Sequence, residues 1–433
     1  MNTGYSIARI GQRLGKMTAL FILGALAFAA CATPPPTASP TTAPTQAPAA
    51  ATTAPTQAPA ASAEPIKIGM LTDLSSSFTP WGVQARDGMT LAVKEINEAG
   101  GVNGRKLELI SQDDENKADV GVDRFERLVE DGAVAVGGII SSGVGAPVGA
   151  AAEKAKVPVF LVKSGTETAL TRGSRYTFRT CLPAAPMDAA PLLQYAKEKG
   201  FKKVGAIVAD YPWGKAIKAA IENTFKDSGI EYIIEVAPVP PNTDFTPFVR
   251  KMADFGAQMI IGTGHPPGNT AIVALSADLA GNVPVTGSWV PPDLAVGGLK
   301  DVAIGRFSDF SCADYFSDSY ADLAKRYLAF SDNKLMSDDA VAGYAIVQMV
   351  AQAVGKVGDD PVAIAKYLHE NEFNMPGYAH PLSWTEWGEL AKAQPIFTTI
   401  SAGPAPAGLN EAGDWWFTLL SHSAPIKPYE PTK

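Results

Sequence analysis

The 433-residue chain contains few cysteines and histidines, no excess of positive charge and no series of long apolar runs. Its 44 acidic residues outnumber its 36 lysines and arginines, whereas a nucleic-acid binder needs a surplus of basic side chains. Without repeated apolar runs of roughly 20 residues, a polytopic membrane protein is excluded. Three cysteines in so long a chain exclude a small disulfide-framed domain. The length predicts two or three domains, each with its own core.

Sequence signatures of catalysis and metal binding are also missing. The chain has no G-x-S-x-G elbow, no G-x-x-x-x-G-K-[ST] loop and no H-E-x-x-H pair, and its four histidines show no metal-ligand spacing. Gly262-Thr263-Gly264 lacks the third glycine of a dinucleotide fingerprint. Asp113-Asp114-Glu115 is interpreted as a solvated loop rather than a metal cluster. We therefore expect no catalytic residues, no cofactor and no metal.

Residues 1–30 have the features of an export signal. A basic segment at 9–16 precedes an uncharged apolar run at 17–30, which is too short to span a bilayer comfortably. The run ends at Phe28-Ala29-Ala30-Cys31, which resembles a bacterial lipobox, although residues 27–29 also fit the small-x-small site of ordinary signal peptidase. We expect lipid modification at Cys31, and hence a chain anchored by its lipid to the outer face of the cell membrane.

Residues 31–65 are predicted to form a tether after the lipidated cysteine. Alanine, threonine, proline, glutamine and serine make up almost all of it, and TTAPTQAPAA occurs at 41–50 and again at 52–61. Such a segment has little to bury and many prolines to keep it extended, so we expect it to be disordered.

From Ile66 onward, short β-rich runs alternate with amphipathic stretches, in two series separated near Cys181. The expected strands are 66–71, 106–111, 133–140, 157–162, 202–209, 231–236 and 258–262. The expected helices are 85–96, 117–130, 147–155, 187–199, 213–228, 245–255 and 269–280. This alternation is typical of parallel sheets covered by helices on both faces. It predicts an α/β fold of two doubly wound lobes.

The predicted strand ends carry small polar groups in the first series and rings in the second. Ligands of such sheets lie beyond the carboxyl ends of the strands. In the first series these ends are Ser75 to Ser77, Ser141 to Gly143 and Ser164 to Thr166. In the second they are Asp210 to Trp213, His265 to Pro267 and Ser288-Trp289. Serine, glycine and proline are also ordinary turn residues, so each site taken singly stays open.

Ten short stretches occur in an order that is typical of one family. They are Ile68 to Ser75, Trp81-Gly82, Glu95 to Leu107, Asp113-Asp114, Gly165-Thr166, Leu170 to Gly173, Phe178 to Thr180, Asp210 with Trp213-Gly214, Asp244-Phe245 and Gly343-Tyr344. Over about 330 residues the chain resembles the type I periplasmic binding proteins of the branched-chain amino acid and amide family.

The resemblance implies a Venus-flytrap, in which two lobes joined by a three-segment hinge close over a ligand. The first lobe would comprise 66–181 and 312–394, and the second 182–311 and 395–433. The chain would act as a monomer that captures a small carboxylate-bearing solute and delivers it to the permease of an ABC importer. The same fold feeding a membrane sensor, or an enzyme, are the alternatives.

Carried over position by position, the resemblance gives Ser142 the role of holding the ligand carboxylate. The other first-lobe contacts would come from Ser164, Gly165, Thr166 and Trp81. The second-lobe contacts would be aromatic and come from Tyr211, Trp213, His265 and Trp289. Trp289 stands where amino-acid binders of the family usually have a glutamate that pairs with the ligand ammonium.

Two expectations follow from this resemblance. Cys181 and Cys312 would lie on neighbouring hinge segments, where an oxidising compartment favours a disulfide, with two buried thiols as the alternative. The ligand would be an aromatic or aliphatic carboxylate without an ammonium, an apolar amino acid paired by another acid such as Asp210 or Asp293, or an amide or other solute.

Overall fold

The computed structural model describes most of the chain beyond the export signal and tether. The described residues are 64–432 without 240–243, 264, 282 and 288–290. The chain divides into two units, Met1–Pro59 and Ala60–Lys433, and all described residues belong to the second. The predicted signal, the predicted lipidation of Cys31 and nearly all of the predicted tether therefore lie outside the described residues.

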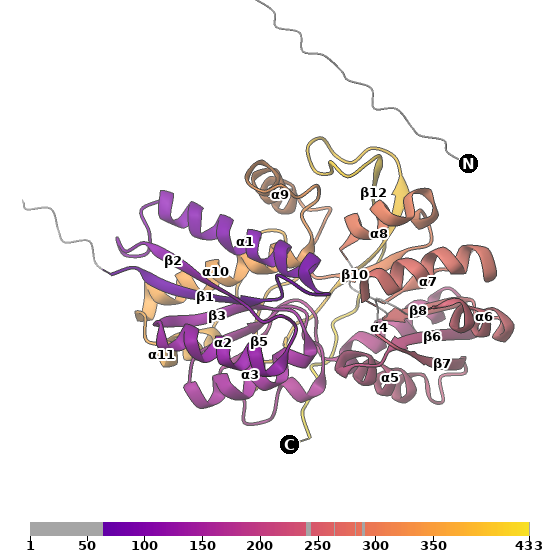
Figure 1. Cartoon of the computed structure of the whole chain (residues 1–433), viewed down its shortest axis with the longest axis horizontal. Coiled ribbons are helices and arrows are strands. Elements are labelled where there is room, and N and C mark those ends of the chain that lie inside the picture. The colour runs from indigo at the N-terminus through magenta and orange to yellow at the C-terminus, as the bar shows by residue number, and fades with distance from the viewer. Residues whose placement is uncertain (1–63, 240–243, 264, 282, 288–290, 433) are drawn as a thin grey trace, which may run out of the picture. The chain divides into compact units, whose positions relative to one another are not determined.

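A five-stranded parallel sheet forms the centre of the first lobe (Figure 1). Its strands are β1 (Ile66–Thr72), β2 (Leu107–Asp113), β3 (Ala133–Ile139), β4 (Val159–Leu161) and β5 (Thr177–Arg179). They pair in the order β2-β1-β3-β4-β5, and every pairing is parallel. All residues of β3 are buried, as expected for a strand covered on both faces.

Helices cover both faces of this sheet. The helices of the first lobe are α1 (Thr79–Glu98), α2 (Ala118–Glu130), α3 (Ser142–Ala155), α9 (Asp318–Phe330), α10 (Asp338–Val357) and α11 (Pro361–Glu370). Successive side chains of β1 point to opposite faces, so Leu71 joins the core under α2 and α3 whereas Met70 joins the core under α1 and α10. A Cβ at Gly88 would lie 2.1 Å from the Ala340 carbonyl oxygen, so glycine allows α1 and α10 to approach closely.

Among the described residues, α10 is long and apolar enough to cross a membrane by length and composition. Within that apolar window, 67% of the residues are buried inside the protein. Core helices of soluble lobes have the same character, and the packing of α10 against α1 and β3 accounts for it here.

A second parallel sheet forms the other lobe. Its strands are β6 (Lys203–Ala209), β7 (Glu231–Ala237), β8 (Met259–Thr263) and β9 (Val285–Thr286), in the order β7-β6-β8-β9. Its helices are α4 (Ala185–Glu198), α5 (Pro212–Phe225), α6 (Thr246–Phe255), α7 (His265–Leu279) and α8 (Pro292–Leu299). Two short 3₁₀ turns complete the helical elements, η1 (Glu167–Ala169) and η2 (Lys300–Ala303). The two sheets confirm the predicted fold class.

A third, antiparallel sheet was not predicted from the sequence. It comprises β10 (Ser308–Ser311), β11 (Ile396–Ala402) and β12 (Trp415–His422), in that order. A parallel bridge between Val285 and Phe307 connects it to the edge of the second sheet. The chain after β12 then returns to the first lobe, where Arg172 Nε donates to the Pro431 carbonyl at 2.8 Å. The last residues of the predicted second lobe thus contact the first.

The expected elements up to residue 280 are present, with two displaced boundaries near the predicted site. The helix expected at 85–96 begins at Thr79, so that Trp81 lies within it. The helix expected at 147–155 begins earlier, at Ser142. Pro147 suggested a start because proline is favoured in a first helical turn, but it lies inside the helix. Ser141 provides the actual cap, since its Oγ accepts the Gly143 N–H at 3.2 Å. Ser142 is therefore the first residue of a helix rather than part of a loop.

Candidate functional site

The hydroxyls predicted to hold a carboxylate lie on neighbouring loops at the carboxyl end of the first sheet. Ser142 follows β3 and begins α3, and Ser164 follows β4. A Cβ at Gly145 would lie 2.2 Å from Ser164 Oγ, so the β4 loop packs against the first turn of α3. The structure therefore brings Ser142 and Ser164 to the same edge of the sheet.

Both of these hydroxyls are buried without a protein partner. Ser142 Oγ and Ser164 Oγ make no hydrogen bond to any described residue. An unsatisfied buried polar group costs about 1–3 kcal/mol, which a bound acceptor or donor would recover. The amino terminus of α3, a helix of 14 residues, adds a positive dipole end at Ser142. The arrangement can therefore receive an anionic group such as a carboxylate.

Thr166 and Gly165 complete the loop after β4 in different ways. Thr166 is buried, but its Oγ1 lies 3.2 Å from Thr168 Oγ1, so its hydroxyl already has a partner. Gly165 lies against the ring of Trp213 on α5, since a Cβ there would lie 2.3 Å from Trp213 Cζ3. Trp213 of the second lobe is thus in contact with the first-lobe loop, and only glycine leaves room for it.

Arg179 supports this loop from within the core and was not assigned a role from the sequence. Its side chain is fully buried, and Nε donates to Glu389 Oε2 at 2.9 Å. Nη1 donates to the Ser164 carbonyl, and Nη2 donates to the Thr166 carbonyl at 2.6 Å. Burial raises the pKa of Glu389, and the Arg179 charge opposes that rise. The stretch Phe178 to Thr180 belonged to the resemblance, but no sequence pattern reveals which carbonyls a buried arginine will meet.

Aromatic rings extend from the first lobe to the second beside this loop. Trp81 is buried on α1, and its ring centroid lies 5.3 Å from that of Phe78. Phe78 in turn lies 6.2 Å from Tyr211, which directly precedes α5. Burial raises the pKa of Tyr211 well above its usual range, so the phenol stays neutral. Phe78 was missed from the sequence because it follows three serines that mark a turn.

Those serines form a turn around the carboxylate of Asp73. Asp73 Oδ1 accepts the backbone N–H groups of Ser75 and Ser76 at 3.1 and 2.7 Å, and Asp73 Oδ2 accepts that of Phe78 at 2.8 Å. A side chain that satisfies successive amides in this way fixes a turn. Here the turn sets the position of Phe78.

Some predicted site residues cannot be placed, and the two proposed acids differ. Ser288 and Trp289 lie outside the described residues, as does the side chain of His265. Asp210 is exposed and pairs with Lys215 at 3.1 Å. Asp293 lies in the first turn of α8, its Oδ1 is buried with no partner among the described residues, and burial raises its pKa. Asp293 therefore has a buried carboxyl oxygen without a described partner, whereas Asp210 is already paired.

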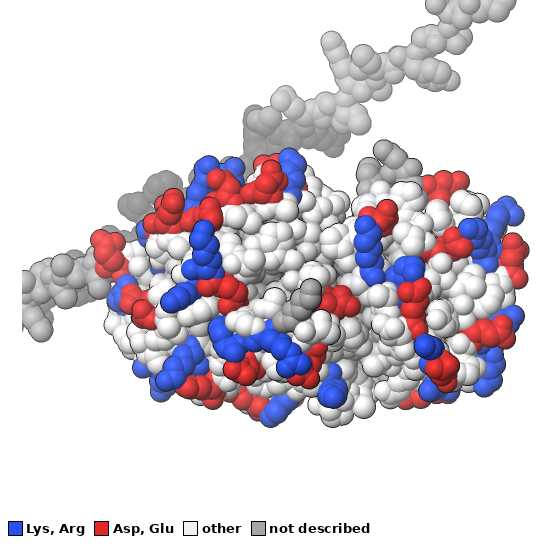
Figure 2. Space-filling model, turned by 90° about the horizontal axis from the view of Figure 1, so that it is seen from below, with Lys and Arg blue, Asp and Glu red and all other residues white. Residues whose placement is uncertain are grey.

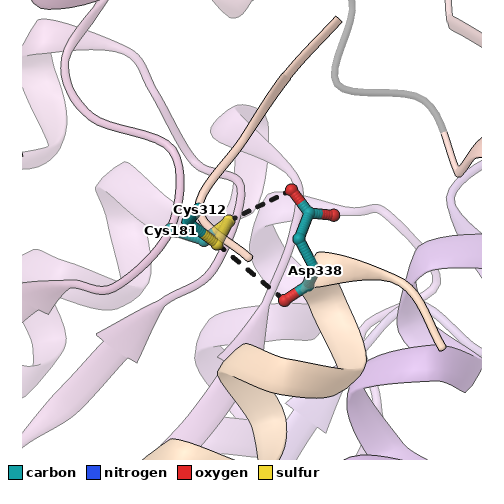
Figure 3. A group of neighbouring side chains, drawn as sticks. All are labelled: Cys181, Cys312 and Asp338. Atoms are coloured by element: carbon teal, nitrogen blue, oxygen red, sulfur yellow. Dashed lines mark hydrogen bonds between the residues drawn. A yellow bond between two sulfur atoms is a disulfide. The ribbon is translucent and has the colours of Figure 1, made fainter. Parts of the chain in front are cut away.

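The segments leading into and out of the two lobes are joined by a disulfide between Cys181 and Cys312, with Cα atoms 5.3 Å apart (Figure 3). Both sulfurs touch Asp338 at the start of α10: Cys181 Sγ lies 3.4 Å from Oδ2, and Cys312 Sγ lies 3.9 Å from the backbone carbonyl. Because the sulfurs are bonded to each other, they are not thiolates that could ligate a metal.

A buried ion pair lies next to this disulfide and to the β4 loop. Lys163 Nζ lies 2.8 Å from Asp338 Oδ2 and 3.8 Å from Asp339 Oδ1. Burial holds the pKa of Asp339 well above its usual range, although the Lys163 charge opposes this. The pair connects the residue before Ser164 to the first turn of α10.

The surface charges are mixed rather than segregated. Figure 2 shows acidic and basic side chains interspersed on the face that it draws, with no broad basic area there. This pattern agrees with the net charge of -8 and does not resemble the basic footprint of a nucleic-acid binder.

Two parallel-sheet lobes meet here, with hydroxyls that lack a partner among the described residues on one side and rings on the other, and they define a two-lobed solute-binding protein. A family model described as periplasmic binding protein matches residues 65–399. The chain belongs to this family, within the type I group of branched-chain amino acid transporters, which confirms the resemblance. The proteins of this family bind solutes outside the cytoplasm and are not enzymes.

Curated relatives span most of the chain. Leu/Ile/Val-binding protein homolog 3 of Brucella melitensis is 27% identical over 347 residues, which cover 75% of this chain and 89% of the relative. The leucine-, isoleucine-, valine-, threonine- and alanine-binding protein of Pseudomonas aeruginosa is 25% identical, covering 76% of this chain and 88% of the relative.

Solved structures show the same fold. A solute-binding protein from R. palustris in complex with benzoate has a TM-score of 0.71 at 17% identity, covering 84% of this chain and 98% of that one. A fatty acid transporter substrate-binding protein from Thermomonospora curvata has a TM-score of 0.72 at 19% identity, covering 85% and 94%. A substrate-binding protein from Desulfitobacterium hafniense in complex with leucine has a TM-score of 0.63 at 21% identity, covering 82% and 100%.

Proposed function

We propose that this protein captures a small carboxylate-bearing solute between its lobes and delivers it to an ABC importer. The observation that carries the proposal is the pair of buried, unpartnered hydroxyls of Ser142 and Ser164 at the amino terminus of α3. A carboxylate there would accept from both hydroxyls and interact favourably with the helix dipole. Trp81, Phe78, Tyr211 and Trp213 would enclose an apolar body.

The remainder of the ligand is either an amino acid or a carboxylate without an ammonium. The relatives named as binding proteins for leucine, isoleucine and valine favour the first. The benzoate complex of the R. palustris protein and the fatty acid transporter protein of Thermomonospora curvata favour the second. Asp293 supports the first alternative, because its Oδ1 is buried with no partner among the described residues and burial raises its pKa. A ligand ammonium would pair with it, and we propose an apolar amino acid as the better fit.

The test is a thermal-shift and calorimetric panel of leucine, phenylalanine, 4-methylpentanoate and benzoate. A ligand that binds only the folded state raises the melting temperature by mass action. We expect leucine or phenylalanine to bind and Asp293→Asn to weaken that binding by about ten- to a hundredfold. Asp210→Asn is the matched control and should change the affinity little. Tight binding of 4-methylpentanoate without leucine binding would instead identify a carboxylate receptor.

The lipid anchor is a separate part of the proposal. Cys31 would become the acylated first residue of the mature protein, with residues 32–65 as its tether to the membrane. Mass spectrometry of the mature amino terminus should find a lipidated cysteine. A free amino terminus at Ala30 or Ala32 would contradict this. Loss of solute uptake in cells lacking the protein would support delivery to an importer, whereas intact uptake with a lost transcriptional response would indicate a sensor.

A further inference from the structure

The guanidinium of Arg179 directs its donors to two different groups. Its charge is paired with the carboxylate of Glu389, which receives Nε, and the remaining buried donors need further acceptors. The two Nη atoms are instead both directed to the backbone of the β4 loop. They meet the carbonyls of Ser164 and Thr166, which lie on either side of Gly165.

Holding a carbonyl also fixes the direction of an amide. A trans peptide unit is planar, so its N–H points opposite to its C=O. Because the Ser164 carbonyl points at Arg179, the N–H of Gly165 points away from the guanidinium. The Gly165 carbonyl accepts the Ala185 N–H at 3.0 Å, which fixes the next peptide unit in turn. Two successive peptide planes of the loop are thus set by the protein itself.

We propose that Arg179 is a positioning residue that pre-organises the loop 164–166 for an anionic ligand, by turning the Gly165 N–H away from the core and holding Ser164 in place. This inference rests on the proposed ligand site and deepens it. A donor already aimed at its acceptor loses little entropy on binding, so pre-organisation appears directly in the affinity.

Arginine has the geometry for this role and lysine does not. The planar guanidinium presents donors at fixed spacing and can bond two carbonyls and a carboxylate at once. A lysine ammonium at the same position would keep the charge but could not span Ser164 and Thr166 while facing Glu389. Arg179→Lys therefore removes the positioning without removing the charge.

Three variants separate positioning from structural support. Arg179→Lys tests the positioning, and Glu389→Gln weakens the ion pair while leaving both carbonyl contacts possible. Arg172→Lys is the matched control, because Arg172 also bonds a carbonyl and a carboxylate, those of Pro431 and Glu430, but with an exposed side chain. The measurements are the melting temperature, hydrogen exchange of peptides covering 162–170 in the ligand-free protein, and calorimetry with leucine and 4-methylpentanoate.

We expect Arg179→Lys to speed exchange in 162–170 and to weaken binding by about tenfold or more, comparable to one hydrogen bond to a charged group. Glu389→Gln should lower the melting temperature but leave exchange and affinity near those of the wild type, and Arg172→Lys should leave all three unchanged. If exchange in 162–170 is unaltered in Arg179→Lys, or if affinity falls equally in Glu389→Gln, the positioning role is wrong.

If Arg179→Lys folds poorly, the double variant Arg179→Gln with Glu389→Gln takes its place. This variant removes both buried charges and replaces the guanidinium by one amide group, so faster loop exchange is again expected, and unaltered exchange again refutes the role. Failure of the proposed function has a different signature. If neither leucine nor 4-methylpentanoate binds the wild-type protein while Arg179→Lys still frees the loop, the ligand class is wrong and the positioning of the loop is upheld.

Discussion

Gly165→Ala should interfere with the meeting of the two lobes while leaving each lobe intact. The added Cβ would lie 2.3 and 2.7 Å from Cζ3 and Cε3 of Trp213, and 2.9 Å from Leu182 Cδ2. Carbon atoms in proteins pack at about 3.5–4.0 Å, so the indole must move. Trp213 belongs to the other lobe, so separating the lobes relieves the overlap with the ring, whereas Leu182 Cδ2 is the end of a side chain that can turn aside. The substitution therefore opposes closure more than folding.

Overpacking by one methyl group costs typically about 1–3 kcal/mol. If ligand binding requires closure, the whole of this cost appears in the affinity, as a loss of about five- to a hundredfold. Isothermal titration of the ligand identified in the panel measures the loss, and the ligand-free melting temperature should change little. Gly297→Ala on α8 is the control, because no heavy atom lies within 4 Å of a Cβ there.

A double variant tests the stated cause. Replacing the indole by Trp213→Leu should weaken ligand binding by itself. It also removes the atoms that the new methyl group would overlap. The combined loss with Gly165→Ala should therefore be smaller than the sum of the two single losses. Unchanged affinity in Gly165→Ala, or strictly additive losses in the double variant, would refute the proposed packing of Trp213 on this loop.

Three further predictions concern the hydroxyls, a buried acid and the disulfide. Ser142→Ala should weaken carboxylate binding by about ten- to a hundredfold in calorimetry without lowering the ligand-free melting temperature, because Oγ has no partner among the described residues. Asp114 is fully buried, so the interpretation of residues 113–115 as a solvated loop is wrong for this residue, and burial raises its pKa from 3.8 to about 7. The unfolded chain therefore ionises first, stability falls as pH rises from about 4 to 7, and Asp114→Asn should flatten that slope in thermal unfolding. Reduction of Cys181–Cys312 should lower the free energy of unfolding by about 2–4 kcal/mol in denaturant titrations, an effect absent from the double serine variant.

Hydrophobic periodicity predicted the parallel sheets because buried strands and amphipathic helices each have a recognisable pattern over a few neighbouring residues. The alternation from Ile66 to residue 280 located both sheets along the chain, but the short edge strands β5 and β9 were not among the expected strands. The sheet of β10, β11 and β12 was not predicted. Its strands β10 and β11 are about ninety residues apart, as in the pair Ser308 and Thr399, and no local pattern encodes such a pairing. The start of α3 was predicted at Pro147 instead of Ser142. Proline and a capping serine are both typical of a helix start, and the sequence contains both.

Long-range polar contacts explain most of what the sequence could not reveal at the site. Ser142 and Ser164 could be proposed because they follow strands, and Trp81 and Trp213 because they match a family pattern. Arg179 meets Glu389 across 210 positions, a separation at which a single sequence carries no readable signal. The same holds for the contrast between Asp210 and Asp293, which depends on burial and a neighbouring lysine rather than on residue type.

The first lobe supplies hydrogen-bond donors and the second supplies rings. These two kinds of contact tolerate movement of the lobes to different degrees. Hydrogen bonds weaken steeply with angle, so donors for a carboxylate are best held within one rigid body. The loop 164–166 meets this need, because Arg179 and α3 both belong to the first lobe with it. Ring packing is non-directional by comparison and tolerates the small differences in angle that a hinge introduces. If the carboxylate lies at Ser142 and Ser164, the first lobe recognises the polar head in the open protein, and Tyr211 and Trp213 select the apolar body only on closure.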